Sequence, residues 1–464
     1  MNLKSALLTD FYQLTMAYGY WRLGMAEREA VFHLFFRKHP FQGNYAIHCG
    51  LAAVIDYLNH WHFTQEELDY LAELVDVKGQ ALFSAEFLTY LSQLRFSGDL
   101  LAMPEGQVMF AREPILRVRG PILQCQLIET PLVNLTGFAS LIATKASRVC
   151  AAAQGDPVIE FGLRRAQGPD GGMTASRAAF IGGCESVSNT LAAMHYRVPP
   201  RGTMAHSWVM AFADEITAFS RFAEVMAGNA ILLVDTYHTV GGVESAIKVG
   251  RQLRANGSDL LGIRLDSGDL NELSRKARHL LDEAGFTGTK IVASGDLDEH
   301  IIAQLKEQGA PINIWGVGTR LTTGWDQPAL DMAYKLSAIK DEQGSWQYKI
   351  KRSDHPGKTT NPGIQQVHRF LSKQRWITDI IYDVELGLAS NLLADGDHQQ
   401  DLLLPIFTQG QLIYAQPSLS EIQQFCSQQL QQFTDSQWTE YPVRLEPQLQ
   451  AVKELMLAQY EVKK

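Results

Sequence analysis

The densest group of reactive side chains in the sequence lies at residues 264–269, where one arginine and two aspartates fall within six positions. Carboxylates placed in this way can accept hydrogen bonds from a ribose diol or hold Mg²⁺, and an arginine can form a bidentate pair with a substrate carboxylate. Asp266 or Ser267 could instead cap a helix that begins near Asp269. Capping explains one of these polar residues but not Arg264, which stands on a predicted strand, so we favour a binding function.

Three other segments carry groups that could do chemistry. The Gly-Val-Gly-Thr turn at 316–319 could bring backbone N–H groups and a hydroxyl to a phosphate, although glycines are also common in tight turns. His206, in the loop at 202–207 that leads into a predicted helix around 212–222, could be a reactive imidazole or a structural histidine. Asp235 follows directly on an apolar run and could be a ligand-binding carboxylate or a turn cap. Taken alone, these residues leave both interpretations open.

The composition limits the class of protein and the kinds of partner. The chain has 464 residues, of which 46% are hydrophobic and 20% charged, as is typical of a protein that folds around a sizeable core. Its formal net charge is −9, and it contains no block of five or more basic residues. We therefore expect small-molecule ligands, and neither nucleic acid nor a membrane as a partner.

The cysteines and the N-terminal segment favour a cytoplasmic location. Five cysteines are scattered without a C-x-x-C spacing, which indicates reduced thiols rather than a zinc site or a disulfide framework. Asp10 and Gln13 interrupt the apolar stretch at 7–17, so it does not read as a signal peptide. No window approaches the ~18 consecutive apolar residues that a membrane-spanning helix requires.

From about residue 155 to 335, short apolar runs alternate with amphipathic stretches. Five runs are predicted strands, at 157–161, 230–234, 260–265, 290–293 and 312–317. Apolar residues recur at helical spacing in 243–253 and 270–281, as on the core-facing side of a helix. Strand starts near 230, 260 and 290 repeat with the period of a βαβ unit, so we expect a parallel sheet with right-handed crossovers.

The positions of polar groups at the strand ends help to decide between two parallel folds, a barrel and an open sheet. In α/β barrels the active site collects at the carboxyl ends of several strands, and the loops after late strands often bind phosphate. An open doubly wound sheet usually binds its ligand at one switch point. Five strand ends carry candidate groups here, so we prefer a parallel α/β barrel. The groups are Glu160, Asp235, Arg264 with Asp266, Ser294 and the 316–319 turn.

The two ends of the chain differ from this central region. Residues 1–130 combine a helical start, an alternating stretch at 31–36 and a β-rich segment at 98–123 that prolines and glycines punctuate. After residue 335, the stretch at 346–351 and the glutamine-rich tail predict further strands and a final helix.

At these residues the sequence resembles the nicotinate phosphoribosyltransferases, over nearly the whole chain. Any one motif would be weak evidence, but several of six to nine residues in the right order are highly specific. The segments are LLTDFYQLT at 7–15, IET at 128–130, ATKASR at 143–148, EFGLRRAQG at 160–168, GTMAHS at 202–207, DTY at 235–237, RLDSGD at 264–269, GVGT at 316–319 and PG at 362–363.

The resemblance implies a type II phosphoribosyltransferase fold, in which an irregular α/β barrel is joined to a second α+β domain built from both chain ends. We therefore divide the chain into an N-terminal domain at 1–130, a catalytic barrel at 131–335 and a segment at 336–464 that completes the first domain and flanks the barrel. The implied enzyme is a homodimer with shared active sites.

The implied reaction makes nicotinate mononucleotide and diphosphate from nicotinate and 5-phosphoribosyl 1-pyrophosphate, as the first step of NAD salvage from nicotinate. It would use Mg²⁺ and be coupled to the hydrolysis of ATP. The resemblance also implies that Thr203 and Arg264 bind nicotinate and that Tyr12 stacks on its ring from the partner subunit. Glu160 follows the pattern of nicotinate-using enzymes and is implied to be a substrate-binding residue.

Other residues are implied to bind the phosphorylated substrates. Thr319, with Gly318, would hold a phosphate of phosphoribosyl pyrophosphate, and Arg148 would meet its diphosphate. Asp235 and Asp266 are similar to the ribose and metal carboxylates of the related nicotinamide-using enzymes. His206 matches a histidine that ATP phosphorylates transiently.

Two positions depart from the family pattern. His238 stands where the family usually has Asp, and Gln365 stands where it usually has Lys. Both bear on phosphate binding, not on the reaction class.

Two alternatives compete with the nicotinate assignment. A nicotinamide phosphoribosyltransferase would share the barrel but have Asp at the position of Glu160. A catalytically silent barrel that acts as a sensor or scaffold would be expected to have lost reactive groups, whereas His206, Arg264, Asp266 and Thr319 are all present.

Overall fold

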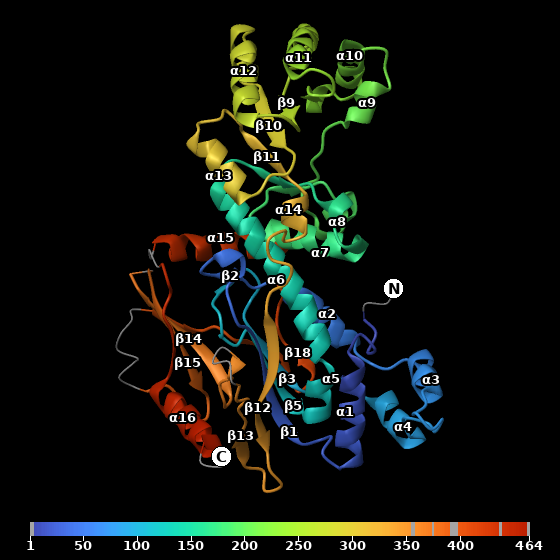
Figure 1. Ribbon diagram of the computed structural model, residues 1–464, viewed down its shortest axis with the longest axis vertical. Coiled ribbons are helices and arrows are strands. Elements are labelled where there is room, and N and C mark those ends of the chain that lie inside the picture. Colours follow the sequence, from blue (N-terminus) through green and yellow to red (C-terminus); the bar gives the residue numbers. More distant parts are fainter. Residues whose placement is uncertain (1–3, 354–357, 374, 390–397, 436–438, 462–464) are drawn as a thin grey trace. The chain divides into compact units, whose positions relative to one another are not determined.

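The computed structural model describes residues 4–353, 358–373, 375–389, 398–435 and 439–461. The chain forms two compact units (Figure 1). The central unit is Ile142–Pro328, and the terminal unit combines Met1–Leu141 with Ala329–Lys464. Helix α6 (Glu129–Ala152) contains the point at which the chain passes from one unit to the other.

The central unit is built on a six-stranded sheet in which every neighbouring pair is parallel. The strand order is β7 (Ser186–Val187), β6 (Val158–Glu160), β11 (Ile314–Val317), β10 (Lys290–Ser294), β9 (Gly262–Leu265), β8 (Ile231–Leu233). The five predicted strands are confirmed, and β7 is a sixth that the sequence analysis did not identify.

The strand order has the cyclic sequence of an α/β barrel. Taken around a circle from β6, the strands follow in chain order, and among the described residues only the ladder between β7 and β8 is missing. Instead, Val187 pairs with the extended residues at 199–201, through a bridge to Pro200. Pro199 and Pro200 lack backbone N–H groups, so this segment cannot continue a regular ladder. The expected irregular barrel is thus open at this point.

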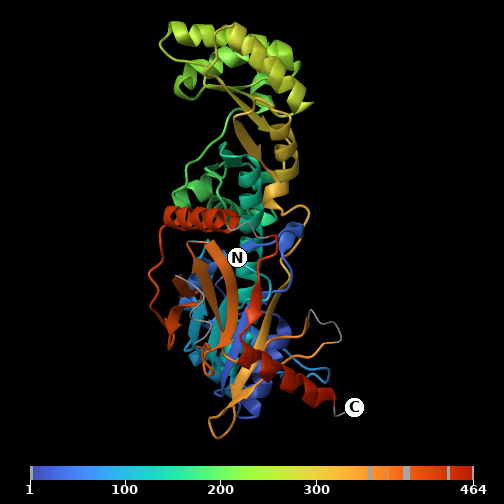
Figure 2. The same cartoon turned by 90° about the vertical axis from the view of Figure 1, so that its left-hand side faces the viewer.

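Helices α11 (Thr239–Ala255) and α12 (Leu270–Glu283) lie side by side and pack against β9 (Figures 1 and 2). Their apolar faces are buried as their spacing predicted. Gly250 of α11 is needed for this packing, because a Cβ there would lie 2.8 Å from the Phe286 ring.

The structure shows which residues cap these two helices, and none of Asp235, Asp266 and Ser267 does so. Asp269 caps α12 by accepting the N–H groups of Asn271 and Glu272, so neither Asp266 nor Ser267 has that role. His238 caps α11, where its Nδ1 accepts the N–H of Gly241.

One expected helix is divided. The sequence analysis placed a helix around 212–222, but the structure has α9 (His206–Met210) followed by α10 (Glu215–Val225). Asp214 accepts the N–H of Thr217 and so starts a new helix after Phe212.

In the terminal unit, both ends of the chain contribute to one antiparallel sheet. Its order is β13 (Trp346–Tyr348), β12 (Met332–Lys340), β1 (Glu29–Phe36), β5 (Leu116–Pro121), β3 (Asp99–Ala102), β17 (Leu404–Thr408), β18 (Gln411–Leu412). The ladder between β1 and β12 joins segments about 300 residues apart. This confirms the second α+β domain built from the N-terminal and C-terminal segments.

Two smaller sheets and several helices complete this unit. The sheets are β16 (His398–Asp401), β14 (Gln365–Ser372), β15 (Arg375–Asp383), β19 (Val443–Leu445) and the pair β2 (Ala46–Ile47), β4 (Val108–Met109). The helices include α1 (Phe11–Arg22), α2 (Leu51–His60), α3 (Gln65–Glu73), α4 (Ala85–Gln93), α5 (Ile122–Leu127), α15 (Leu419–Asp435) and α16 (Pro447–Glu461).

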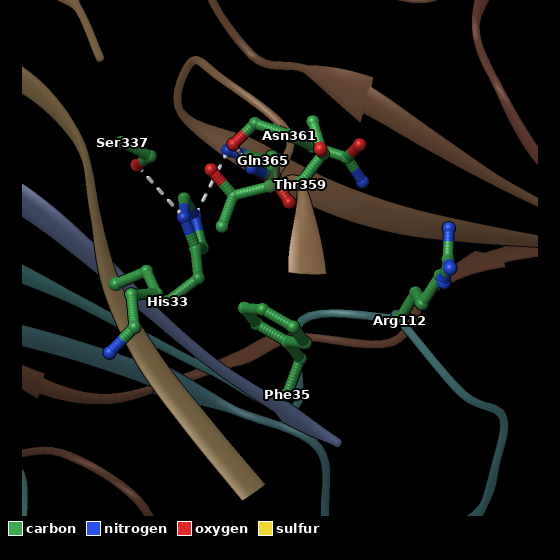
Figure 3. Close-up of a pocket in the computed structure, with 9 residues that line it drawn as sticks. His33, Phe35, Arg112, Ser337, Thr359, Asn361 and Gln365 are labelled. Atoms are coloured by element: carbon green, nitrogen blue, oxygen red, sulfur yellow. Dashed lines mark hydrogen bonds between the residues drawn. The ribbon is translucent and has the colours of Figure 1, made fainter. Parts of the chain in front are cut away.

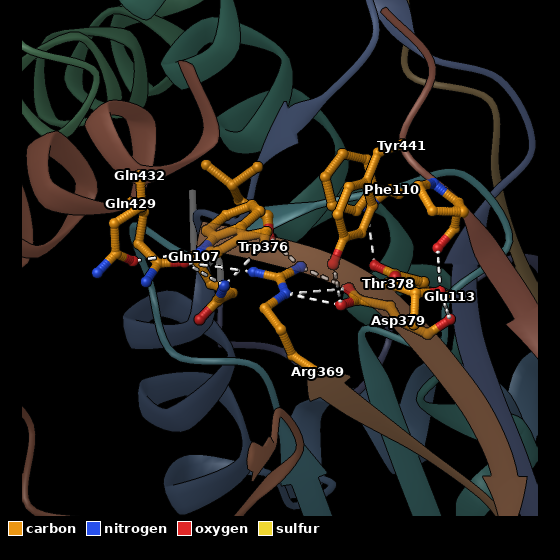
Figure 4. Close-up of polar contacts among 12 residues, drawn as sticks. Gln107, Phe110, Glu113, Arg369, Trp376, Thr378, Asp379, Gln429, Gln432 and Tyr441 are labelled. Carbon is orange, nitrogen blue, oxygen red and sulfur yellow. Dashed lines mark hydrogen bonds and ion pairs between the residues drawn. The ribbon is translucent and has the colours of Figure 1, made fainter. Parts of the chain in front are cut away.

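A fully buried charged cluster lies between β14, β15 and the segment before β5 (Figure 4). Arg369 pairs with Asp379 at 2.5 Å and stacks its guanidinium 3.9 Å from the centroid of the Trp376 ring. The hydroxyl of Tyr441 also donates to Asp379, at 2.8 Å. Burial and the neighbouring Asp379 hold the pKa of Glu113 well above its usual value.

All five cysteines are free thiols, as their spacing predicted. Across the described ranges, no helix is both long enough and apolar enough to span a membrane.

Candidate active site

The guanidinium of Arg264 is the centre of a hydrogen-bonded group at the carboxyl ends of β9 and β10. Its Nε donates to Ser294 at 2.7 Å, its Nη1 to Thr203 at 3.1 Å and its Nη2 to Asp266 at 2.6 Å. The Arg264 side chain is only 13% exposed, so its orientation is fixed by these three contacts. The structure therefore brings together four of the residues singled out in the sequence.

Asp266 is held in its charged form. Burial on its own would raise the pKa of this carboxyl group, but the hydrogen bond from Ser294 and the positive charge of Arg264 outweigh burial and lower it. Ser294 donates to the same carboxylate oxygen that Arg264 contacts. The site thus contains a fixed ion pair rather than a free base.

Asp235 organises the loop that carries Asp266. Its Oδ2 accepts the backbone N–H of Asp266 at 2.9 Å and the hydroxyl of Ser267 at 2.6 Å. Its Oδ1 is buried and has no hydrogen-bond partner among the described residues. Asp235 is not the cap of α11, which is His238, and one of its oxygens remains available to a ligand.

His206 lies beside this group as the first residue of α9. Its Nδ1 is 3.1 Å from the hydroxyl oxygen of Thr236, and its Nε2 is 3.8 Å from Oδ2 of Asp266. The side chain is 41% exposed, so it is not a buried core histidine. A half-exposed imidazole with one nitrogen engaged by a hydroxyl can present the other nitrogen to a ligand.

Phe161 was part of a recognised motif but was not predicted as a site residue. Its ring centroid lies 5.4 Å from the guanidinium carbon of Arg264. A Cβ at Gly316 would lie 2.7 Å from the same ring, so the glycine at the end of β11 makes room for it. An aromatic face next to an arginine can hold a flat, negatively charged ligand, and the aromatic residue beside the EFG motif's glycine was the available signal.

Glu160 does not lie with this group. Its carboxylate accepts the N–H of Gly162 and, at 2.9 Å, the hydroxyl of Ser176 on α7 (Gly168–Ile181). Side chains alternate across a strand, so Glu160 points toward α7 while Phe161 follows on the other face. Burial raises the pKa of Glu160, against the effect of its two hydrogen-bond donors. This geometry fits a residue that fixes the turn before Phe161 rather than one that touches a ligand.

Arg148 and the 316–319 turn belong to a neighbouring part of the same sheet end. Arg148 donates through Nε to Glu299, at 3.0 Å, at the start of α13 (Glu299–Glu307). Gly318 is the N-cap of the short helix α14 (Thr319–Thr322), so Thr319 opens this helix directly after β11. The adjacent Arg320 pairs with Asp298, the cap of α13.

Glu299, His300 and Asp326 could together offer three ligand atoms to a metal ion. Lys145, however, is buried and pairs with both Glu299 and Asp326 at 2.7 Å. Its ammonium group and the guanidinium of Arg148, which also pairs with Glu299, together balance the charge of these two carboxylates. This group is therefore better explained as an ion-pair network than as a metal centre.

Tyr12 lies in the terminal unit, on α1, and its side chain is exposed. The same unit has a small hollow lined by His33, Phe35, Arg112, Lys335, Ser337, Thr359, Thr360, Asn361 and Gln365 (Figure 3). Both ring nitrogens of His33 are engaged, by Ser337 and by the N–H of Gln365, so this histidine is structural.

The side-chain amide of Gln365 donates to the carbonyl groups of Asn361 and Pro362. It therefore stabilises its own turn and supplies no positive charge to the hollow. Arg112 and Lys335 are the cations that line it.

Three segments of the chain match family models. They are the nicotinate phosphoribosyltransferase (NAPRTase) N-terminal domain at residues 7–136, the NAPRTase family at 158–377 and the nicotinate phosphoribosyltransferase C-terminal domain at 392–453.

Relatives match over nearly their whole length. The chain is 41% identical to the nicotinate phosphoribosyltransferase of Bacillus subtilis (strain 168), over 95% of this chain and 92% of the relative. It is 42% identical to nicotinate phosphoribosyltransferase pncB2 of Mycobacterium tuberculosis (strain ATCC 25618 / H37Rv), over 92% of this chain and 87% of the relative. The crystal structure of human nicotinic acid phosphoribosyltransferase is similar with a TM-score of 0.83 and 29% identity, over 96% of this chain and 99% of that one. The chain belongs to the nicotinate phosphoribosyltransferase family.

Proposed function

We propose that this protein forms nicotinate mononucleotide and diphosphate from nicotinate and 5-phosphoribosyl 1-pyrophosphate, with coupling to ATP hydrolysis. The observation that carries the proposal is the fixed guanidinium of Arg264, which Thr203, Ser294 and Asp266 orient beside the ring of Phe161. This group has the charge and shape to receive an aromatic carboxylate. It is therefore the end of the site that we assign to nicotinate.

The selectivity for nicotinate over nicotinamide follows from the charge of this arginine. A charge-assisted hydrogen bond contributes roughly 1.5–3 kcal/mol, and a neutral amide would leave part of the buried guanidinium poorly paired. Glu160 supports this selectivity indirectly, by fixing the turn that places Phe161. Its role is therefore to shape the site and not to contact the substrate directly.

The transfer itself needs no nucleophile from the protein. The ring nitrogen of nicotinate supplies the electron pair for the new C1–N bond, and the departing diphosphate takes the electron pair of the C1–O bond. Positive charge develops on the ribose between these events. Catalysis then consists of holding the two substrates in line and stabilising this charge distribution with fixed groups.

Asp235 and Asp266 are the groups that suit the ribose and a magnesium ion. Carboxylate oxygens are preferred Mg²⁺ ligands, and the buried Oδ1 of Asp235 has no other partner among the described residues. When bound, Mg²⁺ would neutralise charge on the diphosphate. The chain's own contribution is to keep Asp235 hydrogen-bonded to the backbone of Asp266, so that both carboxylates keep their positions.

His206 is the group that we assign to ATP coupling. If its Nδ1–H donates to Thr236, the lone pair of Nε2 is free to attack the γ-phosphorus of ATP, forming an N–P bond while ADP leaves with the electrons of the broken P–O bond. Water would later return the phosphate to solution. The added charge, about −1.5 to −2 by analogy with other phosphorylated side chains, would change substrate affinity nearby.

The remaining assignments rest on the family relationship. We propose that Arg148, Gly318 and Thr319 bind phosphate groups, that Tyr12 contacts nicotinate from the partner subunit of a homodimer, and that the enzyme works in the cytoplasm. The exposed position of Tyr12 is compatible with a contact to a second subunit.

The experiment is a product assay. Purified full-length protein is given labelled nicotinate, phosphoribosyl pyrophosphate and Mg²⁺, with and without ATP, and the products are identified by mass spectrometry. We expect labelled nicotinate mononucleotide and diphosphate, with a higher yield and release of ADP and phosphate when ATP is present. Folded protein that makes no nicotinate mononucleotide under either condition would overturn the proposal.

A further inference from the structure

The LLTDFYQLT motif at 7–15 and the IET motif at 128–130 are joined by hydrogen bonds in the terminal unit. The hydroxyl of Thr130 donates to Oδ2 of Asp10 at 2.6 Å, and the backbone N–H of Asp10 lies 3.4 Å from the same hydroxyl oxygen. Thr9 donates to the carbonyl of Leu127 at 3.1 Å. The N-cap of α1 and the residue before it are therefore attached to the junction between α5 and α6.

Next to this attachment is a buried polar group. Gln13 occupies a fully buried position of α1, beside Leu14 and Ala17, where an apolar residue would be expected. Its amide donates to Oε2 of Glu129 at 3.0 Å and accepts from Gln126 at 2.5 Å. Gln126 also donates to Oε2 of Glu129, at 3.0 Å. Burying such a group is costly unless every member is paired, so the three side chains fix one another's positions.

Glu129 is the shared acceptor of this group. Its second oxygen, Oε1, lies 3.6 Å from Nζ of Lys335 on β12. One carboxylate thus connects α1, α5 and β12. Lys335 also lines the hollow of Figure 3, so Glu129 joins the start of α1 to a cation of that hollow.

Tyr12 is the residue that this arrangement presents. It directly precedes the anchored Gln13 in the first turn of α1, and its side chain is exposed. Partial burial raises the pKa of the Tyr12 phenol, and the negative charges of Glu129 and Asp10 raise it further, whereas a hydrogen bond with the Gln13 side chain lowers it.

We propose that Glu129 is a positioning residue, which holds the first turn of α1 so that Tyr12 is oriented to receive nicotinate. This inference rests on the proposed function, in which Tyr12 contacts nicotinate. Without the carboxylate, Gln13 and Gln126 lose their common acceptor, and Lys335 loses its ion-pair partner. The ring of Tyr12 would then sample other orientations, and nicotinate would bind less well.

A double-mutant cycle tests the inference. The Michaelis constant for nicotinate and kcat are measured for the wild type, Glu129→Ala, Tyr12→Ala and the double variant, at saturating phosphoribosyl pyrophosphate and ATP. We expect Glu129→Ala to raise KM for nicotinate about tenfold, the size of effect that loss of a charge-assisted hydrogen bond produces. In the Tyr12→Ala background the same change should have little further effect, because Glu129 acts through Tyr12.

Two further variants separate positioning from folding. Glu129→Gln keeps an acceptor oxygen for the two amides and should restore most of the affinity for nicotinate. Glu67→Ala is a matched control, because Glu67 anchors the N-terminal segment through Ser5 and caps α3 but does not contact the first turn of α1. Its KM for nicotinate should stay at the wild-type value. The inference would be overturned if the KM for nicotinate of the double variant rose by the product of the two single effects. An unchanged KM in folded Glu129→Ala protein would overturn it as well.

A readout without catalysis keeps this test separate from the proposed function. Fluorotyrosine is placed at position 12, and its ionisation is followed by fluorine NMR. Because Glu129 raises the pKa of the phenol, Glu129→Gln should lower the pKa of this residue, whereas Glu67→Ala should not. No difference between Glu129→Gln and the wild type would count against the inference even in an active enzyme. If the wild type makes no nicotinate mononucleotide, the proposed function fails while the NMR result still reports whether Glu129 acts on Tyr12.

Discussion

Nη1 of Arg264 donates to the hydroxyl of Thr203 at 3.1 Å and so links strand β9 to the loop before α9. Both residues were predicted as nicotinate ligands, and their contact shows that one cannot move without affecting the other. This pair is the structural basis of the first prediction.

Replacing Thr203 by the similarly shaped Val should weaken nicotinate binding. The change removes one of the three acceptors that orient the Arg264 guanidinium, and hydrogen bonds to charged groups contribute about 1.5–3 kcal/mol. We expect KM for nicotinate to rise by about tenfold, with a smaller change in kcat and little loss of thermal stability. Thr287→Val, at an exposed position before β10, is the control. An unchanged KM would show that Thr203 does not orient the arginine during binding.

The second prediction concerns His206. His206→Ala should abolish both ATP hydrolysis and acid-labile phosphate on the protein, while a slow transfer without ATP remains, because Arg264, Asp266 and Thr319 still position the substrates. Labelled phosphate on the protein and the thermal midpoint are measured together. His279→Ala, which changes an exposed histidine on α12, should leave phosphorylation intact. A folded His206→Ala protein that is still phosphorylated would refute the assignment.

The third prediction concerns the two subunits of the proposed homodimer. Mixing Tyr12→Ala and Arg264→Ala proteins, each with low activity at limiting nicotinate, should give more activity than the two proteins give separately, because one of the two hybrid sites has both side chains if Tyr12 serves the partner's site. Mixing Arg264→Ala with Asp266→Ala is the control, since both changes lie in the same group of the central unit and no hybrid site has both side chains. If subunits exchange and the first mixture gains no activity, Tyr12 does not act across the dimer.

The fourth prediction uses the buried cluster of Figure 4. Burial, and then the charge of Asp379, raise the pKa of Glu113 well above its ordinary value of 4.5, so Glu113 is protonated in the folded protein and can donate to Asp379. The unfolded chain releases this proton near its ordinary pKa. The stabilising contribution of Glu113 is therefore complete below that value and is lost as the pH rises through the folded-state pKa.

Glu113→Gln should remove this dependence, because an amide can donate to Asp379 at any pH and still accept the N–H of Phe110. The difference in unfolding free energy between wild type and variant should change by up to ~1.4 kcal/mol per pH unit within this window. Thermal unfolding between pH 5 and pH 9, with the exposed Glu73→Gln as control, gives the comparison. Parallel stability profiles for wild type and Glu113→Gln would contradict the assigned protonation.

Much of the central unit could be predicted because its signals are local and periodic. The strands and helices between residues 157 and 317 follow from apolar runs and helical spacing, and the strand ends then bring Arg264 and Asp266 to one edge of the sheet. Strand β7 was not predicted, because a strand of two residues is too short to show a periodic pattern. The break between α9 and α10 was not predicted, because Asp214 acts as an N-cap only once the preceding turn has formed.

Side-chain direction was harder to predict than position. Glu160 and Phe161 are neighbours in one motif, but alternation along the strand sends only Phe161 toward Arg264. The roles of the two residues that depart from the family pattern, His238 and Gln365, also became clear only from the structure. His238 serves as the N-cap of α11, a role that Asp would also fill, and Gln365 uses its amide within its own turn.

The most direct test of the central claim is a comparison of kcat/KM for nicotinate and for nicotinamide, measured with the same preparation of wild-type protein. We predict that nicotinate is preferred by well over tenfold, because the fixed and largely buried Arg264 pairs with a carboxylate but not equally with a neutral amide. The preference should collapse in Arg264→Met, in which the charge is removed. Equal turnover of nicotinate and nicotinamide by the wild type would contradict the account.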